Sequence, residues 1–187
     1  MKICVVGAGA IGGMMAVRLA LSGHEVSVVA RGPHLAAIQS SGLKLIQDGE
    51  TLVAQNLTAT NDLKTLGQQD LVLLALKAHQ IESVAADLPM LFHADTVMVT
   101  LQNGIPWWYF QRLGGDFDGR TVEMVDPGGK LANGIDPSRL IGCIAYPAAT
   151  ITSPSVIQHI EGIRFPVGEL DGSNSDRVNA VSAAFIE

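Results

Sequence analysis

Short apolar runs along the chain alternate with stretches in which apolar residues recur at helical spacing. Residues 2–6 form an apolar run with valines, as in a buried parallel strand, and apolar positions at helical spacing follow from residue 14 to residue 20. Further apolar runs predict strands at 25–30, 70–76 and 96–101, and helices are predicted at 33–40 and 78–92. Strands that alternate with helices imply a Rossmann-type, doubly wound α/β fold with a mostly parallel sheet.

Other segments add to this sheet. Two alternating runs, 43–46 and 51–57, flank Asp48-Gly49 and predict a hairpin. The segment 105–139 contains Trp107 and Trp108 and is then rich in Gly, Asp and Pro, so it is expected to be mostly loop, with one candidate strand at 121–125. Shorter strands at 140–150, 155–160 and 164–167 predict an antiparallel or mixed extension.

The last fifteen residues, 173–187, predict a helix capped by Ser173 or Ser175. This helix pattern reaches Glu187 without a C-cap, a glycine or a proline. We therefore expect residues 1–187 to form one domain whose final helix is cut before a further domain.

Glycines follow the first strand at fixed spacing: Gly7, Gly9 and Gly12 form a GxGxxG motif that opens the first helix. In dinucleotide-binding folds the first glycine permits the tight turn, the second lets the backbone approach a pyrophosphate, and the third lets the helix pack on the strand. The free N–H groups and positive dipole end of the helix then face the phosphates. Strand, glycines and helix in this register predict a dinucleotide site; the alternative is a glycine-rich turn without a ligand.

Composition narrows the classes of partner. The 187 residues are 48% hydrophobic and carry a net charge of −6, so nothing suggests a surface for nucleic acid. Cys4 and Cys143 lie in apolar runs and are predicted to be core residues. The histidines show no ligand spacing, so no metal site is expected. Without a signal peptide or an apolar stretch of about 20 residues, we expect a cytoplasmic protein with no membrane partner.

Polar residues follow three of the predicted strands. Arg31 ends the second strand, where NAD-specific sheets usually place an acidic residue; an arginine suits a 2′-phosphate, which favours NADP over NAD. A solvated arginine at the start of a helix is the alternative. Lys77 and Asn103 follow the strands at 70–76 and 96–101, at the edge where open sheets bind ligands. An ammonium and a carboxamide there can hold a keto acid and the nicotinamide ribose.

Four motifs in this order resemble the ketopantoate reductase (2-dehydropantoate 2-reductase) family. They are GAGAIG at 7–12, HEVSVVAR at 24–31, LKAHQ at 76–80 and QNGI at 102–105, and IGCIAYPAA at 141–149 and Gly168-Glu169 extend the match. The resemblance covers nearly the whole chain as the family's N-terminal cofactor domain. It implies an enzyme that uses NADPH to reduce a branched 2-keto acid on the route to pantothenate and coenzyme A.

The resemblance also implies roles for single residues. The backbone that would cradle the pyrophosphate comprises Gly7, Ala8, Gly9, Ala10, Ile11 and Gly12. Arg31 would hold the 2′-phosphate of NADP. Lys77, Gln80 and Asn103 would line the nicotinamide side, with Asn103 also reaching the substrate, and Ala148 would offer its backbone to the cofactor.

The family's catalytic lysine, its proton donor, lies in a helical C-terminal domain, and no residue of this chain matches it. We therefore expect no catalytic residue here and a fragment that is inactive alone, with an apolar face that would favour a homodimer. Two alternatives stay open. The chain belongs to a reductase of another 2-keto acid or opine-type substrate, which the long segment 105–139 favours, or it is a non-catalytic module that senses dinucleotides.

Overall fold

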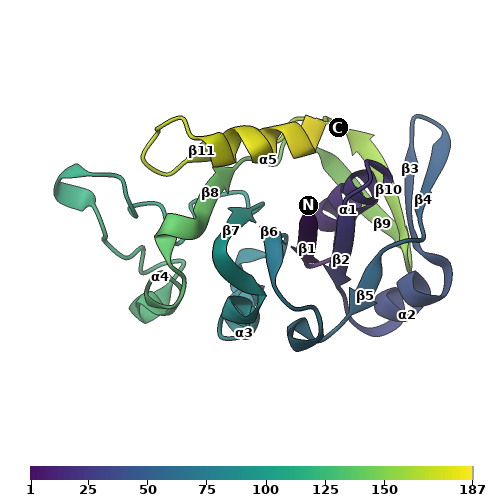
Figure 1. The fold of residues 1–187 in the computed structure, drawn as a ribbon, viewed down its shortest axis with the longest axis horizontal. Helices are drawn as coiled ribbons and strands as arrows, with labels where there is room; N and C mark the ends of the chain where they lie inside the picture. The colour runs from purple at the N-terminus through teal and green to yellow at the C-terminus, as the bar shows by residue number, and fades with distance from the viewer. Residues whose placement is uncertain (187) are drawn as a thin grey trace.

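A computed structural model describes residues 1–186 and contains two sheets (Figure 1). The main sheet has seven strands in the order β11-β8-β7-β6-β1-β2-β5. Its strands are β1 (Lys2–Val6), β2 (Glu25–Val29), β5 (Thr58–Thr60), β6 (Gln69–Leu74), β7 (Phe92–Thr100), β8 (Leu140–Cys143) and β11 (Val167–Glu169). All neighbours pair in parallel except β11 with β8. The predicted doubly wound α/β fold is confirmed.

The second sheet has four strands in the order β4-β3-β10-β9. They are β3 (Leu43–Gln47), β4 (Glu50–Ala54), β9 (Ala148–Ser153) and β10 (Val156–Glu161). Asp48 and Gly49, both at positive φ, form the turn between β3 and β4, which confirms the predicted hairpin. β10 pairs in parallel with β3, so this sheet joins segments far apart in the sequence.

Helix α1 (Ala10–Leu21) lies between the two sheets, as Figure 1 shows. It is buried on most sides. A Cβ atom added at Gly13 would lie 2.2 Å from Cδ1 of Ile157 in β10. α2 (Gly32–Ser41) follows β2, and α5 (Asp176–Ile186) runs along the top of the view in Figure 1. Ser175 caps α5 because its Oγ accepts a hydrogen bond from the N–H of Val178, as the sequence predicted.

The predicted helix over 78–92 is wrong in its continuity. This segment holds a 3₁₀ turn at Ala78–Gln80, the single turn α3 (Glu82–Ala85) and a second 3₁₀ turn at Leu88–Leu91. Pro89 explains the break, because it has no N–H for the helix ladder and disfavours helical geometry in the residue before it. The apolar spacing still marked the buried face, since Ile81, Val84, Leu88 and Leu91 are all buried.

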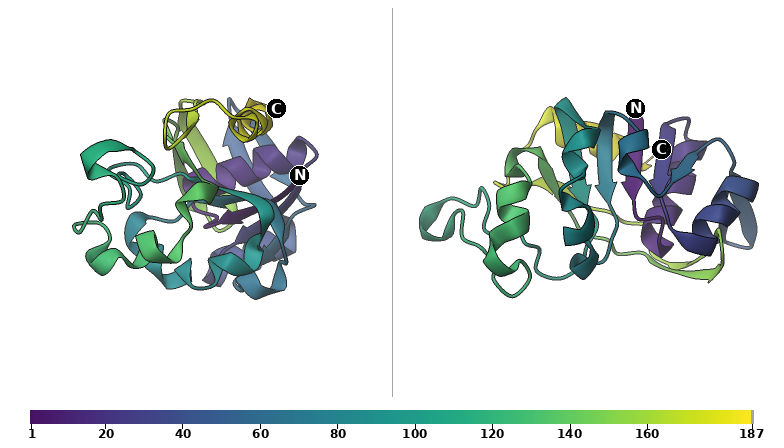
Figure 2. Two further views of the ribbon diagram at one scale, coloured as in Figure 1. Left: turned by 60° about the vertical axis from the view of Figure 1, so that its left-hand side comes forward. Right: turned by 90° about the horizontal axis from the view of Figure 1, so that it is seen from below.

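The C-terminal half differs from expectation in three places. The strand predicted at 164–167 is displaced, because β11 begins only at Val167. Residues 121–125 form a turn rather than a strand, with the N–H groups of Val125 and Asp126 both bonded to the carbonyl of Val122. The predicted strand at 140–150 splits into β8 and β9, which belong to different sheets. Pro147 lies in the break between them, where a ladder N–H is lost. Two views in Figure 2 show the loop-rich part of 105–139, with the short helix α4 (Lys130–Gly134), standing out from the sheets.

Apolar side chains fill both faces of the main sheet. Cys4 and Cys143 are free and buried on opposite faces, which confirms them as core residues, and burial raises the pKa of each thiol to about 12. Trp107 is also buried, and Trp108 donates from Nε1 to Thr100 Oγ1 over 3.1 Å, so the tryptophan pair packs on β7. Across residues 1–186, no helix is long and apolar enough to cross a membrane.

Candidate functional site

The loop between β1 and α1 needs two of its glycines for the fold itself. Gly7 has φ +106°, and its N–H and that of Ala8 both donate to the carbonyl of Val29, over 3.2 and 3.0 Å. A Cβ at Gly12 would lie 2.1 Å from the Gly7 carbonyl oxygen and 2.6 Å from the Cβ of Ala75. The turn and the close helix–strand contact therefore exclude larger residues at both positions.

Gly9 is different, because nothing in the chain requires a glycine there. Its φ of −69° is open to any residue, and a Cβ would meet no atom within 4 Å. Gly9 is the N-cap residue of α1. Ala10, Ile11 and Gly12 form the first turn of the helix, where no preceding carbonyl accepts their N–H groups. A bare backbone with free donors at the start of a twelve-residue helix fits a pyrophosphate.

A cleft of about 240 Å³ opens at this loop. The walls come from the glycine loop, the end of β2, the segment 76–84 and one residue of β9. The lining residues include Gly7, Ala8, Gly9, Arg31, His34, Leu76, Gln80 and Ile151. The structure thus brings five of the predicted cofactor residues to one cleft, at the carboxyl edge of the sheet where open α/β folds bind ligands.

Arg31 lines this cleft. It is exposed, caps α2 in extended conformation, and its guanidinium has no hydrogen bond or ion pair within residues 1–186. Lys77 is also exposed and follows Leu76, which lines the cleft; its N–H donates to Gln80 Oε1 over 3.3 Å. Arg31 is therefore placed where an anionic ligand in the cleft would meet it, and Lys77 stands next to a residue of the cleft wall.

Six of the predicted cofactor residues are not among those that line the cleft: Ala10, Ile11, Gly12, Lys77, Asn103 and Ala148. Asn103 is exposed at the end of β7 and donates from Nδ2 to the Ala145 carbonyl over 3.3 Å. Ala148 opens β9, where it pairs with Glu161. The structure leaves the roles of both residues toward a cofactor as predictions.

Sequence reasoning missed two residues that shape this edge. Gln102 donates from Nε2 to the carbonyls of Leu74 and Leu76, over 2.6 and 2.9 Å, and so fixes the ends of β6 and β7 side by side. His34 contacts the glycine loop at the Ala8 carbonyl. Gln102 stands within the QNGI motif and His34 near the start of a predicted helix, but neither local pattern reveals a bond to a distant backbone group.

Larger hollows lie elsewhere in the described part of the chain. One, of about 490 Å³, lies at the far end of α1 and is lined mainly by apolar groups such as Met15, Leu52 and Phe185. Another, of about 530 Å³, is lined by polar side chains that include Asp95, Asp136, Arg139 and Arg177. The Arg177 side chain lowers the pKa of Glu169, but this pair joins α5 to β11. Within residues 1–186 no group of three or more His, Cys, Asp or Glu side chains is arranged to hold a metal.

The chain is similar to known proteins. The family model of ketopantoate reductase PanE/ApbA matches residues 3–107. The chain is 45% identical, over its whole length, to the 2-dehydropantoate 2-reductase of Mesorhizobium japonicum, and covers 57% of that protein. A solved structure from Ralstonia solanacearum is 41% identical, with a TM-score of 0.92 over 98% of this chain and 57% of that one. The 2-dehydropantoate 2-reductase structure from Geobacter metallireducens is 26% identical, with a TM-score of 0.79 over all of this chain and 55% of that one.

The chain therefore spans little more than half the length of these relatives. The match to the family model includes the glycine loop, Arg31, Lys77 and Asn103, so the residues that suggested the family lie within the matched range. The main sheet and its glycine loop agree with the same assignment. The chain belongs to the ketopantoate reductase PanE/ApbA family, a family of oxidoreductases.

Proposed function

We propose that the chain binds NADP(H) in the cleft at the glycine loop, as the cofactor-binding part of an NADPH-dependent 2-keto acid reductase. The observation that carries this proposal is the pairing of Gly9 with Arg31 on one cleft. Gly9 leaves space that only a ligand would need, and Arg31 offers a free guanidinium beside it. A pyrophosphate and a 2′-phosphate are groups that suit these two features.

Each residue has a part in this proposal. The N–H groups of Ala10, Ile11 and Gly12 bind the pyrophosphate, and Arg31 pairs with the 2′-phosphate. Lys77, Gln80 and Asn103 orient the nicotinamide side and, at Asn103, the substrate. Bound NADPH supplies the hydride that reduces the keto carbon. The chain's own contribution is to bind and orient the cofactor.

The names of the relatives support 2-dehydropantoate as the 2-keto acid. Pantothenate synthesis in the cytoplasm is the setting that the proposal adds. Binding of this substrate by the chain is part of the proposal, and so is dependence on NADP rather than NAD.

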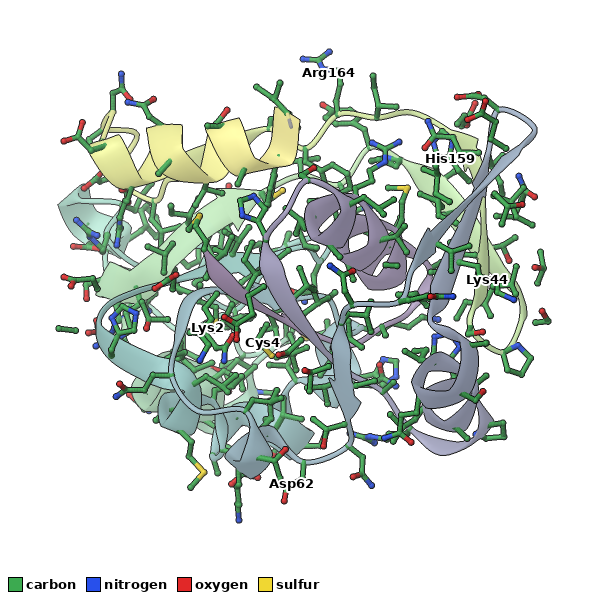
Figure 3. The ribbon with its side chains drawn as sticks, turned by 45° about the vertical axis from the view of Figure 1, so that its right-hand side comes forward. Lys2, Cys4, Lys44, Asp62, His159 and Arg164 are labelled. Atoms are coloured by element: carbon green, nitrogen blue, oxygen red, sulfur yellow. The ribbon has the colours of Figure 1, made fainter. Side chains whose placement is uncertain are left out.

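Titration of the chain with NADP⁺ and with NAD⁺ tests the cofactor. We expect NADP⁺ to bind more tightly, and Arg31→Ala to remove about 1.5–3 kcal/mol of NADP⁺ binding, the range for hydrogen bonds to charged groups, with little effect on NAD⁺. Arg164→Ala is the matched control, because Arg164 is an exposed arginine that Figure 3 shows pointing into solvent and that is absent from the cleft lining. Equal affinities for the two dinucleotides in the parent chain would contradict the proposal.

A further inference from the structure

His34 joins three segments that are far apart in the sequence. Its ring stands in the first turn of α2, half-buried, at the wall of the cleft. Nε2 lies 2.7 Å from the carbonyl oxygen of Ala8 in the glycine loop. On the other side, the N–H of Ser155, in the turn between β9 and β10, donates to Nδ1 over 3.1 Å. One imidazole therefore links the glycine loop to the second sheet.

The two partners fix the state of the ring. A carbonyl oxygen only accepts, so Nε2 must carry a proton; a backbone N–H only donates, so Nδ1 must carry a lone pair. Both bonds exist together only for the neutral imidazole with its proton on Nε2. A second proton, on Nδ1, would face the Ser155 N–H and break that bond.

The turn between β9 and β10, whose Ser155 N–H bonds to Nδ1, is itself fixed in place. Ser155 is buried, with 2% of its surface exposed, and has φ +61°. Its carbonyl accepts the N–H of Lys44 at the start of β3, over 2.8 Å. The ring is thus supported by an ordered part of the second sheet rather than by a free loop, and it can hold the Ala8 carbonyl in place.

The held carbonyl determines the geometry of the pyrophosphate loop. In a trans peptide the C=O and N–H groups point in opposite directions, so fixing the Ala8 carbonyl toward His34 also fixes the N–H of Gly9 on the other side. The hydrogen bond from Nε2 also reduces the negative electrostatic potential of the Ala8 carbonyl, which lies beside the place proposed for the two phosphates. Resting on the proposed function, we infer that His34 is a positioning residue for dinucleotide binding, which acts through Ala8 and Gly9 without touching the cofactor.

A different role for this ring would be a direct bond to the 2′-phosphate, because Arg31 lies on the same cleft. The two hydrogen bonds use both ring nitrogens, which leaves none for a phosphate. The two roles predict different losses of affinity for the two dinucleotides, because only NADP⁺ carries the 2′-phosphate.

Dinucleotide titrations of the parent, His34→Ala and His34→Gln chains separate the two roles. His34→Ala should lower the affinity for NADP⁺ and for NAD⁺ by the same factor, about tenfold, because the pyrophosphate is common to both. His34→Gln retains a donor and an acceptor and should lose less.

His159→Gln is the matched control. His159 lies on β10, labelled with Lys44 on the second sheet in Figure 3, and its Nε2 is 2.6 Å from the Gly162 carbonyl, away from the cleft. This variant should bind both dinucleotides as the parent does. Thermal unfolding of every variant checks the fold, and His34→Gln carries the comparison if His34→Ala is unfolded at the assay temperature.

Three results would overturn the inference. Unchanged affinities in both His34 variants would show that the ring does not position the loop. A loss for NADP⁺ alone would make the ring a direct ligand of the 2′-phosphate. A parent chain that binds neither dinucleotide would overturn the proposed function as well, which distinguishes that failure from the first two.

Discussion

The glycine loop allows two neighbouring substitutions to be tested against each other. Gly9 and Gly12 stand three residues apart in one motif, yet the structure gives them different reasons to be glycine. The fold requires Gly12, whereas only a ligand would require Gly9. We therefore expect Gly12→Ala to lower the stability of the chain and Gly9→Ala to lower its affinity for a dinucleotide.

The cost at Gly12 follows from three close contacts. The added Cβ would lie 2.1 Å from the Gly7 carbonyl oxygen, 2.6 Å from the Cβ of Ala75 and 3.2 Å from Cγ1 of Val5. Backbone has to move, because the nearest atom belongs to the main chain of the loop itself. Overpacking of this kind costs about 1–3 kcal/mol or more, a large part of the 5–15 kcal/mol that typically stabilises a domain.

The corresponding change at Gly9 is nearly neutral for the fold. Alanine is a poorer helix cap than glycine, which costs on the order of 0.5–1 kcal/mol. Loss of glycine's freedom in the unfolded chain returns about 0.4–1 kcal/mol, since φ −69° suits alanine. The free energy of unfolding should therefore change by less than about 0.5 kcal/mol. The new methyl group occupies the space proposed for the pyrophosphate, and Gly9→Val, with a branched side chain, should abolish binding.

Urea unfolding and NADP⁺ titration of the same preparations measure both effects. Agreement requires Gly12→Ala to shift the unfolding midpoint to lower urea and Gly9→Val to remove binding with the parent's midpoint retained. If Gly9→Val binds NADP⁺ as tightly as the parent, the open space at Gly9 is not a phosphate site. If Gly9→Ala loses as much stability as Gly12→Ala, the argument from the contacts is wrong.

Two further predictions concern the ion pair at α5 and turnover. Arg177→Ala should destabilise the chain by about 3 kcal/mol, since it leaves the Glu169 carboxylate, with 3% of its side chain exposed, without its cation. Arg177 lowers the pKa of Glu169, so this stabilisation is present at neutral pH and is lost as pH falls through that lowered pKa; urea unfolding of parent and variant should converge in acid. We also expect no NADPH oxidation by residues 1–187 with a panel of 2-keto acids, because no residue matches the family's lysine proton donor; turnover with 2-dehydropantoate would refute this.

Local patterns predicted the elements that form the edge of the cleft. The valine run at β1 and the three glycines fixed the first strand, turn and helix, since each position has a steric or packing reason that depends only on near neighbours. Arg31 could likewise be placed, because a residue at the end of a parallel strand lies at the edge that binds ligands. Five of the predicted cofactor residues consequently line one cleft.

Pairings between distant segments could not be predicted in this way. The 140–150 run reads as one strand, although β8 pairs with β7 and β9 with β10, in different sheets. Nothing local to residues 156–158 specifies that they pair with residues 44–46. His34 shows the same limit, because its role depends on Ser155, which lies 121 residues further along the chain.

The parallel pairing of β3 with β10 has a consequence for the order of folding. The hairpin β3–β4 has only itself to pair with until residues 156–158 are available, and a lone two-stranded hairpin is marginally stable in water. Bringing β10 to β3 closes a long loop, and this costs chain entropy before any contact stabilises the pairing. The cost slows folding. During synthesis, the ribosome therefore releases the glycine loop and α1 long before β10 and the Ser155 turn, so the support that His34 receives from that turn arises late.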